Sequence, residues 1–190
     1  EKIKVAQRNW IGKKEGIIIT YPVESGSDLK DPKGLTLSCF TTRPDTNFGA
    51  TFVVMAPEHP FVSSMFSTGA ELLKVKSVSS ESAKALKNKE IDLAGQIQQY
   101  VQDAKKKTAA ERIAEGRKKT GVFTGLYCVN PLNGYKMPLF VSDFVLMGFG
   151  TGAVVGVPGH DKRDYAFAMQ FDIPVKRVVV GADGDSSEIS

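Results

Sequence analysis

The fold is decided by residues 122–146, which read VFTGLYCVNPLNGYKMPLFVSDFVL. β-Branched and aromatic residues fill the two halves, 122–129 and 136–146, and this composition is typical of strands. Between the halves lies Asn133-Gly134, a dipeptide that favours the tight turn of a β-hairpin. Two prolines leave the register of the pairing open, because proline donates no ladder hydrogen bond. We therefore predict two antiparallel strands joined by a turn.

Further strands are predicted on both sides of this hairpin. Residues 35–39 alternate apolar with polar side chains and lead into Thr41, whereas 50–56 is almost continuously apolar, as in a strand covered on both faces. Apolar residues at helical spacing in 93–104 predict a helix. The other predicted elements are strands at 16–21 (ending at Pro22), 152–157 and 175–180, and helices at 57–66 and 161–171. Strands thus flank a helical insertion, which predicts an α+β fold: a β-barrel or curled sheet with helices packed outside it.

Composition sets broad limits on the function. The chain of 190 residues suffices for one domain, and its net charge of +4 is compatible with an RNA partner without demanding one. Cys39 and Cys128 lie in apolar runs, where buried thiols in a reducing compartment are expected rather than a disulfide framework or a zinc set. No apolar stretch is long enough to span a membrane, so a cytoplasmic location is expected.

Residues 105–119 carry seven basic side chains against two glutamates. A run of this kind is most often a solvated helix face. The other interpretation is a surface that contacts nucleic-acid phosphates, which would make binding depend on salt. The sequence leaves both open and favours the first.

Two polar segments are candidates for a functional site. Residues 41–46 place three threonines, a cation and a carboxylate in a turn after a predicted strand, and Asp161 and Asp164 lie where another strand gives way to a helix. Hydroxyls and amides can hold a sugar edge and a carbonyl, and a fixed carboxylate can hold an ammonium group, as an aminoacyl ester requires. Each segment has a plain structural alternative, a turn for the first and a helix cap for the second.

Several other site types are disfavoured. The two histidines, His59 and His160, are far apart in the chain, and no histidine- or cysteine-rich set suggests a metal. The glycine-rich run 148–152 is followed by a predicted strand instead of a helix, so it does not fit a dinucleotide-binding loop.

Four segments, 7–13, 41–60, 119–125 and 150–164, together resemble the connective-peptide editing domain of bacterial-type leucyl-tRNA synthetase. Asp45 and the ending His-Asp-x-Arg-Asp favour the leucyl enzyme over its isoleucyl and valyl relatives. The resemblance implies the β-barrel-like editing domain of class I aminoacyl-tRNA synthetases, with peripheral helices.

The resemblance also implies an activity and partners. The domain would hydrolyse tRNA-Leu mischarged with norvaline, isoleucine or methionine, using no cofactor and no metal. Its partners would be the tRNA-Leu 3′ acceptor end, the amino-acid ester and the rest of the synthetase, with no membrane. The class I signatures His-Ile-Gly-His and Lys-Met-Ser-Lys-Ser are absent, so residues 1–14 and 181–190 are expected to join a catalytic body, the part that uses ATP.

Carried onto this chain, the family's residues receive specific roles. Asp164 would bind the α-ammonium group of the ester. Thr41 and Thr42 would hold the aminoacyl carbonyl and terminal ribose and place the attacking water. Thr46 would reject leucine through its γ-methyl group, and Val157 would line the same pocket.

Three further residues are assigned to substrate binding on the same grounds. Arg43 would contact a phosphate near the tRNA 3′ end, Asp161 would shape the entrance, and Phe149 stands where the family commonly has tyrosine. No residue is an obvious nucleophile or general base, so catalysis by positioning is expected. The competing hypothesis is a non-catalytic tRNA-binding module that uses the basic residues 105–119.

Overall fold

A computed structural model describes residues 4, 15–25, 34–67, 92–114 and 116–180. The motif at 7–13, nearly all of the expected junction 1–14 and the junction 181–190 lie outside these residues.

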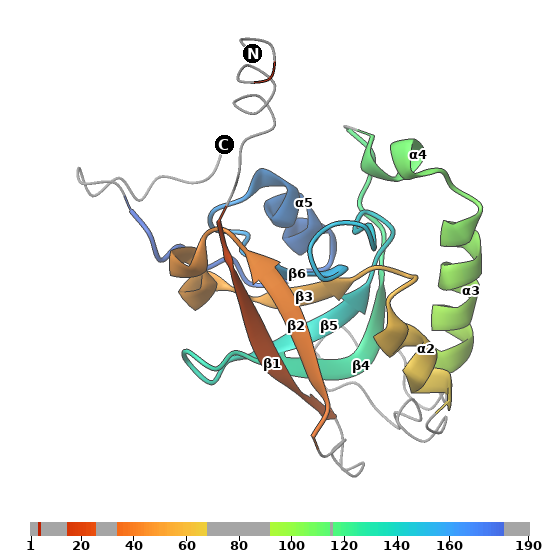
Figure 1. Ribbon diagram of the computed structural model, residues 1–190, viewed down its shortest axis with the longest axis horizontal. Helices are drawn as coiled ribbons and strands as arrows, with labels where there is room; N and C mark the ends of the chain where they lie inside the picture. The colour runs from red at the N-terminus through yellow and green to blue at the C-terminus, as the bar shows by residue number, and fades with distance from the viewer. Residues whose placement is uncertain (1–3, 5–14, 26–33, 68–91, 115, 181–190) are drawn as a thin grey trace.

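Six strands form one mixed sheet that curls into a nearly closed barrel (Figure 1). The order is β2-β1-β4-β5-β3-β6, and neighbouring strands are antiparallel except β3 and β5. The two edge strands, β2 and β6, lie against each other. The strands are β1 (Ile17–Ser25), β2 (Thr36–Thr41), β3 (Phe52–Met55), β4 (Val122–Val129), β5 (Lys136–Val141) and β6 (Ala153–Gly156). The predicted α+β barrel with peripheral helices is confirmed.

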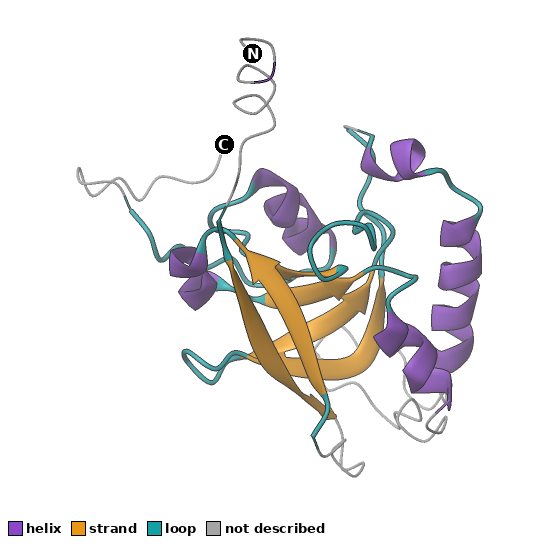
Figure 2. Ribbon diagram, in the orientation of Figure 1, coloured by secondary structure: helices purple, strands orange, loops and turns teal. Residues whose placement is uncertain are grey.

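The helices lie outside the barrel (Figure 2). In that view α2 and α3 stand on one side, and α5 lies behind the other end of the sheet. The helical elements are η1 (Pro44–Gly49), α2 (Pro60–Ser67), α3 (Leu93–Lys105), α4 (Ala109–Ile113) and α5 (Lys162–Gln170).

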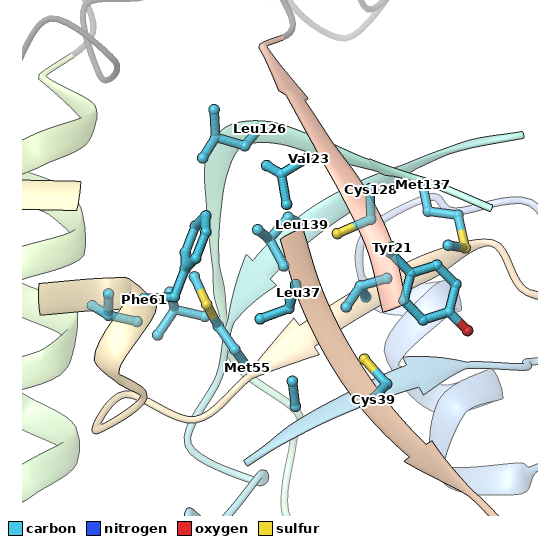
Figure 3. Packing of buried hydrophobic residues seen from close by; sticks show 14 of the residues in the cluster. Tyr21, Val23, Leu37, Cys39, Met55, Phe61, Leu126, Cys128, Met137 and Leu139 are labelled. Carbon is cyan, nitrogen blue, oxygen red and sulfur yellow. The ribbon is translucent and has the colours of Figure 1, made fainter. Parts of the chain in front are cut away.

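Two apolar clusters hold these layers together. The first fills the barrel with inward side chains such as Tyr21, Leu37 and Leu139 (Figure 3). The second lies between the sheet and α5, where the Phe52 and Phe167 rings stack with centroids 5.0 Å apart. Strand β3 contributes alternate residues to both clusters, so it is buried on both faces as its continuous apolar run predicted.

The hairpin at the centre of the prediction is present. Strand β4 has the predicted bounds, and the loop before β5 closes through a 2.8 Å bond from the Gly134 N–H to the Asn130 carbonyl. Gly134 has φ +71°, a conformation that glycine adopts without strain. The register question is resolved by a shift between Phe123 and Tyr127, after which Pro138 pairs with Tyr127.

Two predicted strand boundaries and one predicted strand were wrong. Strand β1 continues past Pro22, which lies where β1 passes from β2 to β4 and therefore interrupts no continuous ladder. Strand β5 ends at Val141, because the chain leaves the sheet at Asp143 to form ion pairs. Residues 175–180 form no strand, since the N–H groups of Val178 and Val179 bond to a histidine side chain instead.

Candidate functional site

The predicted site segments meet at one end of the barrel. The register pairs Thr41, at the end of β2, with the start of β1, and it pairs the start of β3 with Gly156, at the end of β6. Since β2 also lies against β6, the end of β2, the start of β3 and the end of β6 surround the same mouth (Figure 1). The fold thereby brings together Thr41 and Gly156, which are more than 100 residues apart in the sequence.

Thr41 lies at the inner side of this mouth. Leu37 and Cys39 point into the barrel, and strand alternation places Thr41 on the same face. Its hydroxyl oxygen accepts a 3.0 Å bond from the Arg43 N–H, which turns the chain out of the strand. Thr42 is exposed beside it.

The turn η1 holds Thr46 beneath the surface. Thr46 is 2% exposed, and its hydroxyl donates a 2.8 Å bond to the Arg43 carbonyl. On the outside of the turn, Arg43 makes a two-pronged ion pair with Asp45, at 2.9 and 2.8 Å. A phosphate would have to share or replace this pair to reach Arg43.

Asp164 lies in the first turn of α5, next to the residue that follows β6 at this mouth. One carboxylate oxygen, Oδ2, accepts a 2.9 Å bond from the Val157 N–H, and no described residue bonds to the other oxygen. Burial raises the pKa of the Asp164 carboxyl to about 7; the Val157 bond opposes the rise and the nearby Asp161 carboxylate adds to it. A cation placed at the second oxygen would favour ionisation.

Asp161 is the N-cap of α5, as its structural alternative predicted. Its Oδ1 accepts bonds from the N–H groups of Arg163 and Asp164, at 2.8 and 3.1 Å. Although burial opposes it, the hydrogen bonds with Arg163 and Asp164 keep the pKa of Asp161 below its ordinary value. Asp161 therefore stays ionised and fixes the start of the helix that carries Asp164.

A segment at 176–179 ties the two halves of the mouth together. His160 Nε2 accepts bonds from the N–H groups of Val178 and Val179, at 3.0 and 3.4 Å. A Cβ at Gly159 would lie 2.1 Å from the Lys176 carbonyl oxygen, and one at Gly49 would lie 2.7 Å from it. Glycine at both positions lets this strap, residues 176–179, cross η1 and the turn before α5.

The remaining predicted residues lie around the mouth or apart from it. Val157 packs on the inner barrel cluster. Phe149 is 67% exposed on the turn after Leu146, and its ring contacts no aromatic ring of the described residues. A Cβ at neighbouring Gly150 would lie 3.1 Å from the Cβ of Phe40 in β2. The structure thus brings Thr41, Val157 and Asp164 to one mouth and leaves the Phe149 ring largely exposed to solvent.

A buried network below η1 was missed by the sequence analysis. The Tyr21 hydroxyl donates a 2.7 Å bond to Asn47 Oδ1, and Asn130 Nδ2 donates a 2.8 Å bond to the Asn47 carbonyl. All three residues are at most 1% exposed. The sequence places Asn47 directly after the turn 41–46 and Asn130 directly after the strand 122–129, and an asparagine at such a position by itself indicates only a turn.

The basic residues 105–119 serve largely to attach the helical insertion. Arg112 is 6% exposed and binds Glu58 at 2.7 Å, while Lys107 and Arg117 bind Asp143 at 2.8 and 2.6 Å. Burial alone would raise the pKa of Asp143, but Arg117 and Lys107 outweigh it and lower that pKa. The expected solvated helix face is wrong for this segment: α4 covers only Ala109–Ile113, and four of the cations, Lys106, Lys107, Arg112 and Arg117, pair within the domain.

Within the part of the chain that the structure describes, no group of three or more histidine, cysteine, aspartate or glutamate side chains could hold a metal ion. No helix there has the length and apolar character needed to cross a membrane.

Comparisons with known proteins agree with this architecture. The family described as "Leucyl-tRNA synthetase, editing domain" matches residues 8–93 and 77–190. Leucine–tRNA ligases from Streptomyces coelicolor and a Synechococcus strain are 42% and 40% identical, over 100% and 98% of this chain. The chain spans 18% of the length of each. A solved ternary complex of Agrobacterium radiobacter K84 agnB2 LeuRS with tRNA and LeuAMS is also similar, with TM-score 0.64 and 34% identity, covering 100% of this chain and 19% of that one.

Fold and similarity together define an editing domain of an aminoacyl-tRNA synthetase. The chain belongs to the leucyl-tRNA synthetase editing domain family.

Proposed function

We propose that this domain hydrolyses amino acids wrongly esterified to tRNA-Leu, with norvaline, isoleucine and methionine as the noncognate side chains. The observation that carries the proposal is the Asp164 carboxylate, which is anchored through one oxygen to Val157, the residue after β6, while Thr41 ends the adjacent strand β2. A half-buried carboxylate with one unbonded oxygen is suited to an α-ammonium group.

The chemistry follows from positioning. Water adds to the ester carbonyl, the bond between that carbon and the ribose oxygen breaks, and the proton released by the water ends on the ribose hydroxyl. Asp164 would fix the ammonium end of the substrate, while Thr41 and the exposed Thr42 would hold the carbonyl and the ribose. Restraining these groups would contribute to the rate without a strong base, because a water bound among them would be held near the ester carbonyl.

Specificity would come from the bottom of the site. A single methylene is worth only about 1–3 kcal/mol in an apolar pocket, so binding alone discriminates poorly between similar side chains. Buried Thr46, whose hydroxyl is held by the Arg43 carbonyl, would exclude leucine by steric conflict, and Val157 would form the opposite wall.

The remaining residues would receive the tRNA. Arg43 would exchange its Asp45 partner for a phosphate near the 3′ end, Asp161 would hold the entrance through its cap of α5, and Phe149 would offer an exposed ring beside it. We expect the rest of a synthetase to deliver that end in the cytoplasm. Hydrolysis would need no cofactor, ATP being used only in the catalytic body.

The test is deacylation of isoleucyl-tRNA-Leu and leucyl-tRNA-Leu by this chain. We expect hydrolysis of the isoleucyl ester alone, its loss in Asp164→Ala, and hydrolysis of the leucyl ester by Thr46→Ala. Retention of full activity by Asp164→Ala would refute the assignment of the ammonium site. Salt-dependent tRNA binding without turnover would favour the competing RNA-binding module.

A further inference from the structure

The turn that carries Thr46 depends on side chains from elsewhere in the barrel. Its N-cap, Arg43, makes no side-chain capping bond, and its 3-10 geometry gives weaker hydrogen bonds than an α-helix. Its position must therefore be set mostly from outside. The residues that do this come from β1 and from the hairpin loop between β4 and β5.

Asn47 is the centre of these contacts. Its side chain accepts the Tyr21 hydroxyl at 2.7 Å and donates to Asn130 Oδ1 at 3.4 Å, and its carbonyl accepts Asn130 Nδ2 at 2.8 Å. A further bond of 3.1 Å runs from Asn133 Nδ2 to the Phe48 carbonyl. The turn is thus fastened to two separate elements through four side-chain bonds.

Each polar group in this network has a fixed role as a hydrogen-bond donor or acceptor. Burial raises the pKa of the Tyr21 hydroxyl, which stays protonated and acts as the donor to Asn47. Asn130 Oδ1 is fixed as an acceptor because it also receives the Leu132 N–H at 3.0 Å. Each amide is thereby locked in a single orientation, and loss of one member leaves a buried partner unpaired.

Thr46 directly precedes Asn47 and has little freedom of its own. Its hydroxyl is bound to the Arg43 carbonyl, and only 2% of the residue is exposed. Because van der Waals repulsion rises steeply with overlap, a small retreat of the turn would relieve a clash between a threonine methyl group and a branched ligand.

We propose that Tyr21, Asn47 and Asn130 are positioning residues for specificity: they hold η1, and with it Thr46, in the place that excludes the cognate side chain. The inference rests on the proposed function, since it concerns which ester the site rejects. It assigns the buried network a role in discrimination that no contact with substrate would reveal.

The test uses Tyr21→Phe, which removes one oxygen and leaves the ring in the core. Its matched control is Tyr100→Phe, which removes a hydroxyl bonded to Thr120 at 2.8 Å on the α3 side of the domain. The measured quantity is the ratio of kcat/KM for leucyl-tRNA-Leu to that for isoleucyl-tRNA-Leu. We expect this ratio to rise about threefold to tenfold in Tyr21→Phe, the range of one lost buried bond, and to stay unchanged in Tyr100→Phe.

A second measurement does not depend on hydrolysis. The ¹H–¹³C methyl resonance of Thr46 should shift and broaden in Tyr21→Phe and in the surface variant Asn133→Ala, but not in Tyr100→Phe. If neither ester is hydrolysed by the unmodified chain, the proposed function fails while the methyl resonance still decides the positioning role. An unchanged Thr46 resonance in Tyr21→Phe, or an equal fall in activity on both esters, would overturn the inference.

Discussion

Replacing Asp164 by asparagine should stabilise this domain while removing the proposed ester hydrolysis. The amide oxygen can still accept the Val157 N–H, which Asp164 now accepts at 2.9 Å. The variant therefore keeps the hydrogen bond and loses only a charge that the fold holds away from water.

The size of the effect follows from the pKa shift. The carboxyl titrates near 3.8 when unfolded and burial raises its pKa to about 7 in the fold. Below the unfolded pKa the carboxyl is protonated in both states and does not lower the free energy of unfolding. That free energy then falls as pH rises from the unfolded pKa through the folded pKa, because the unfolded state loses this proton more readily than the native state. A gap of about three units amounts to ~4 kcal/mol in all, of which ~2.5 kcal/mol falls between about pH 5 and about pH 8.

The assay is urea unfolding followed by circular dichroism at these two pH values. The stability of Asp164→Asn relative to the unmodified chain should grow by ~2.5 kcal/mol from the lower to the higher pH. Asp161→Asn is the control: because the pKa of Asp161 is lowered, this group is ionised in both the folded and the unfolded state at the two pH values, and the relative stability of the variant should be the same at both. If Asp164→Asn gained nothing on going to the higher pH, the carboxylate would not be destabilised and our reading of the mouth would be wrong.

Three further perturbations test other parts of the structure. Burial, Arg177 and Arg43 lower the pKa of His160. The free energy of unfolding should therefore fall as pH drops below the pKa of His160 in the unfolded state, and amide exchange at Val178 and Val179 should increase. His160→Gln retains a hydrogen-bond acceptor and should abolish this pH response. Arg112→Ala should cost about 1–3 kcal/mol in urea unfolding, because the carbonyls of Asp143 and Val145 lose a buried donor. Exposed Lys118→Ala should change little, and an equally small loss in Arg112→Ala would contradict the anchoring role of Arg112. Gly159→Ala should lower the melting temperature by displacing the strap, whereas Gly148→Ala, with open space around it, should not; equal melting temperatures would place the strap elsewhere.

Local pattern predicted the elements whose packing is uniform. The bounds of β4 and the α5 start at its Asp161 cap both followed from residues within each element. Patterns failed where distant groups decide the structure. The apolar run 175–180 resembles a strand, yet its N–H groups bond to His160, and the run 136–146 is cut at Asp143 by cations more than 20 residues away in sequence.

The site could be predicted only through family resemblance. Nothing in residues 41–46 or 157–164 alone indicates that they meet, because their proximity depends on β2 lying against β6. The buried network beneath the candidate site could not be predicted from the sequence for the same reason. Tyr21, Asn47 and Asn130 come from three separate elements, and each looks ordinary where it stands in the sequence.

The strands that bring Thr41 and Val157 to the mouth are the two edges of the sheet, and no backbone hydrogen bond joins them in the described residues. Widening the barrel between any other pair of neighbouring strands would break ladder bonds, whereas separating β2 from β6 would break none. The wall of the candidate site is therefore held by ladder hydrogen bonds except between β2 and β6, where only side-chain packing holds it. Amino-acid side chains of different width would be accommodated by movement between β2 and β6. The turn η1, which the network of Tyr21, Asn47 and Asn130 holds in place, would exclude those that clash with it.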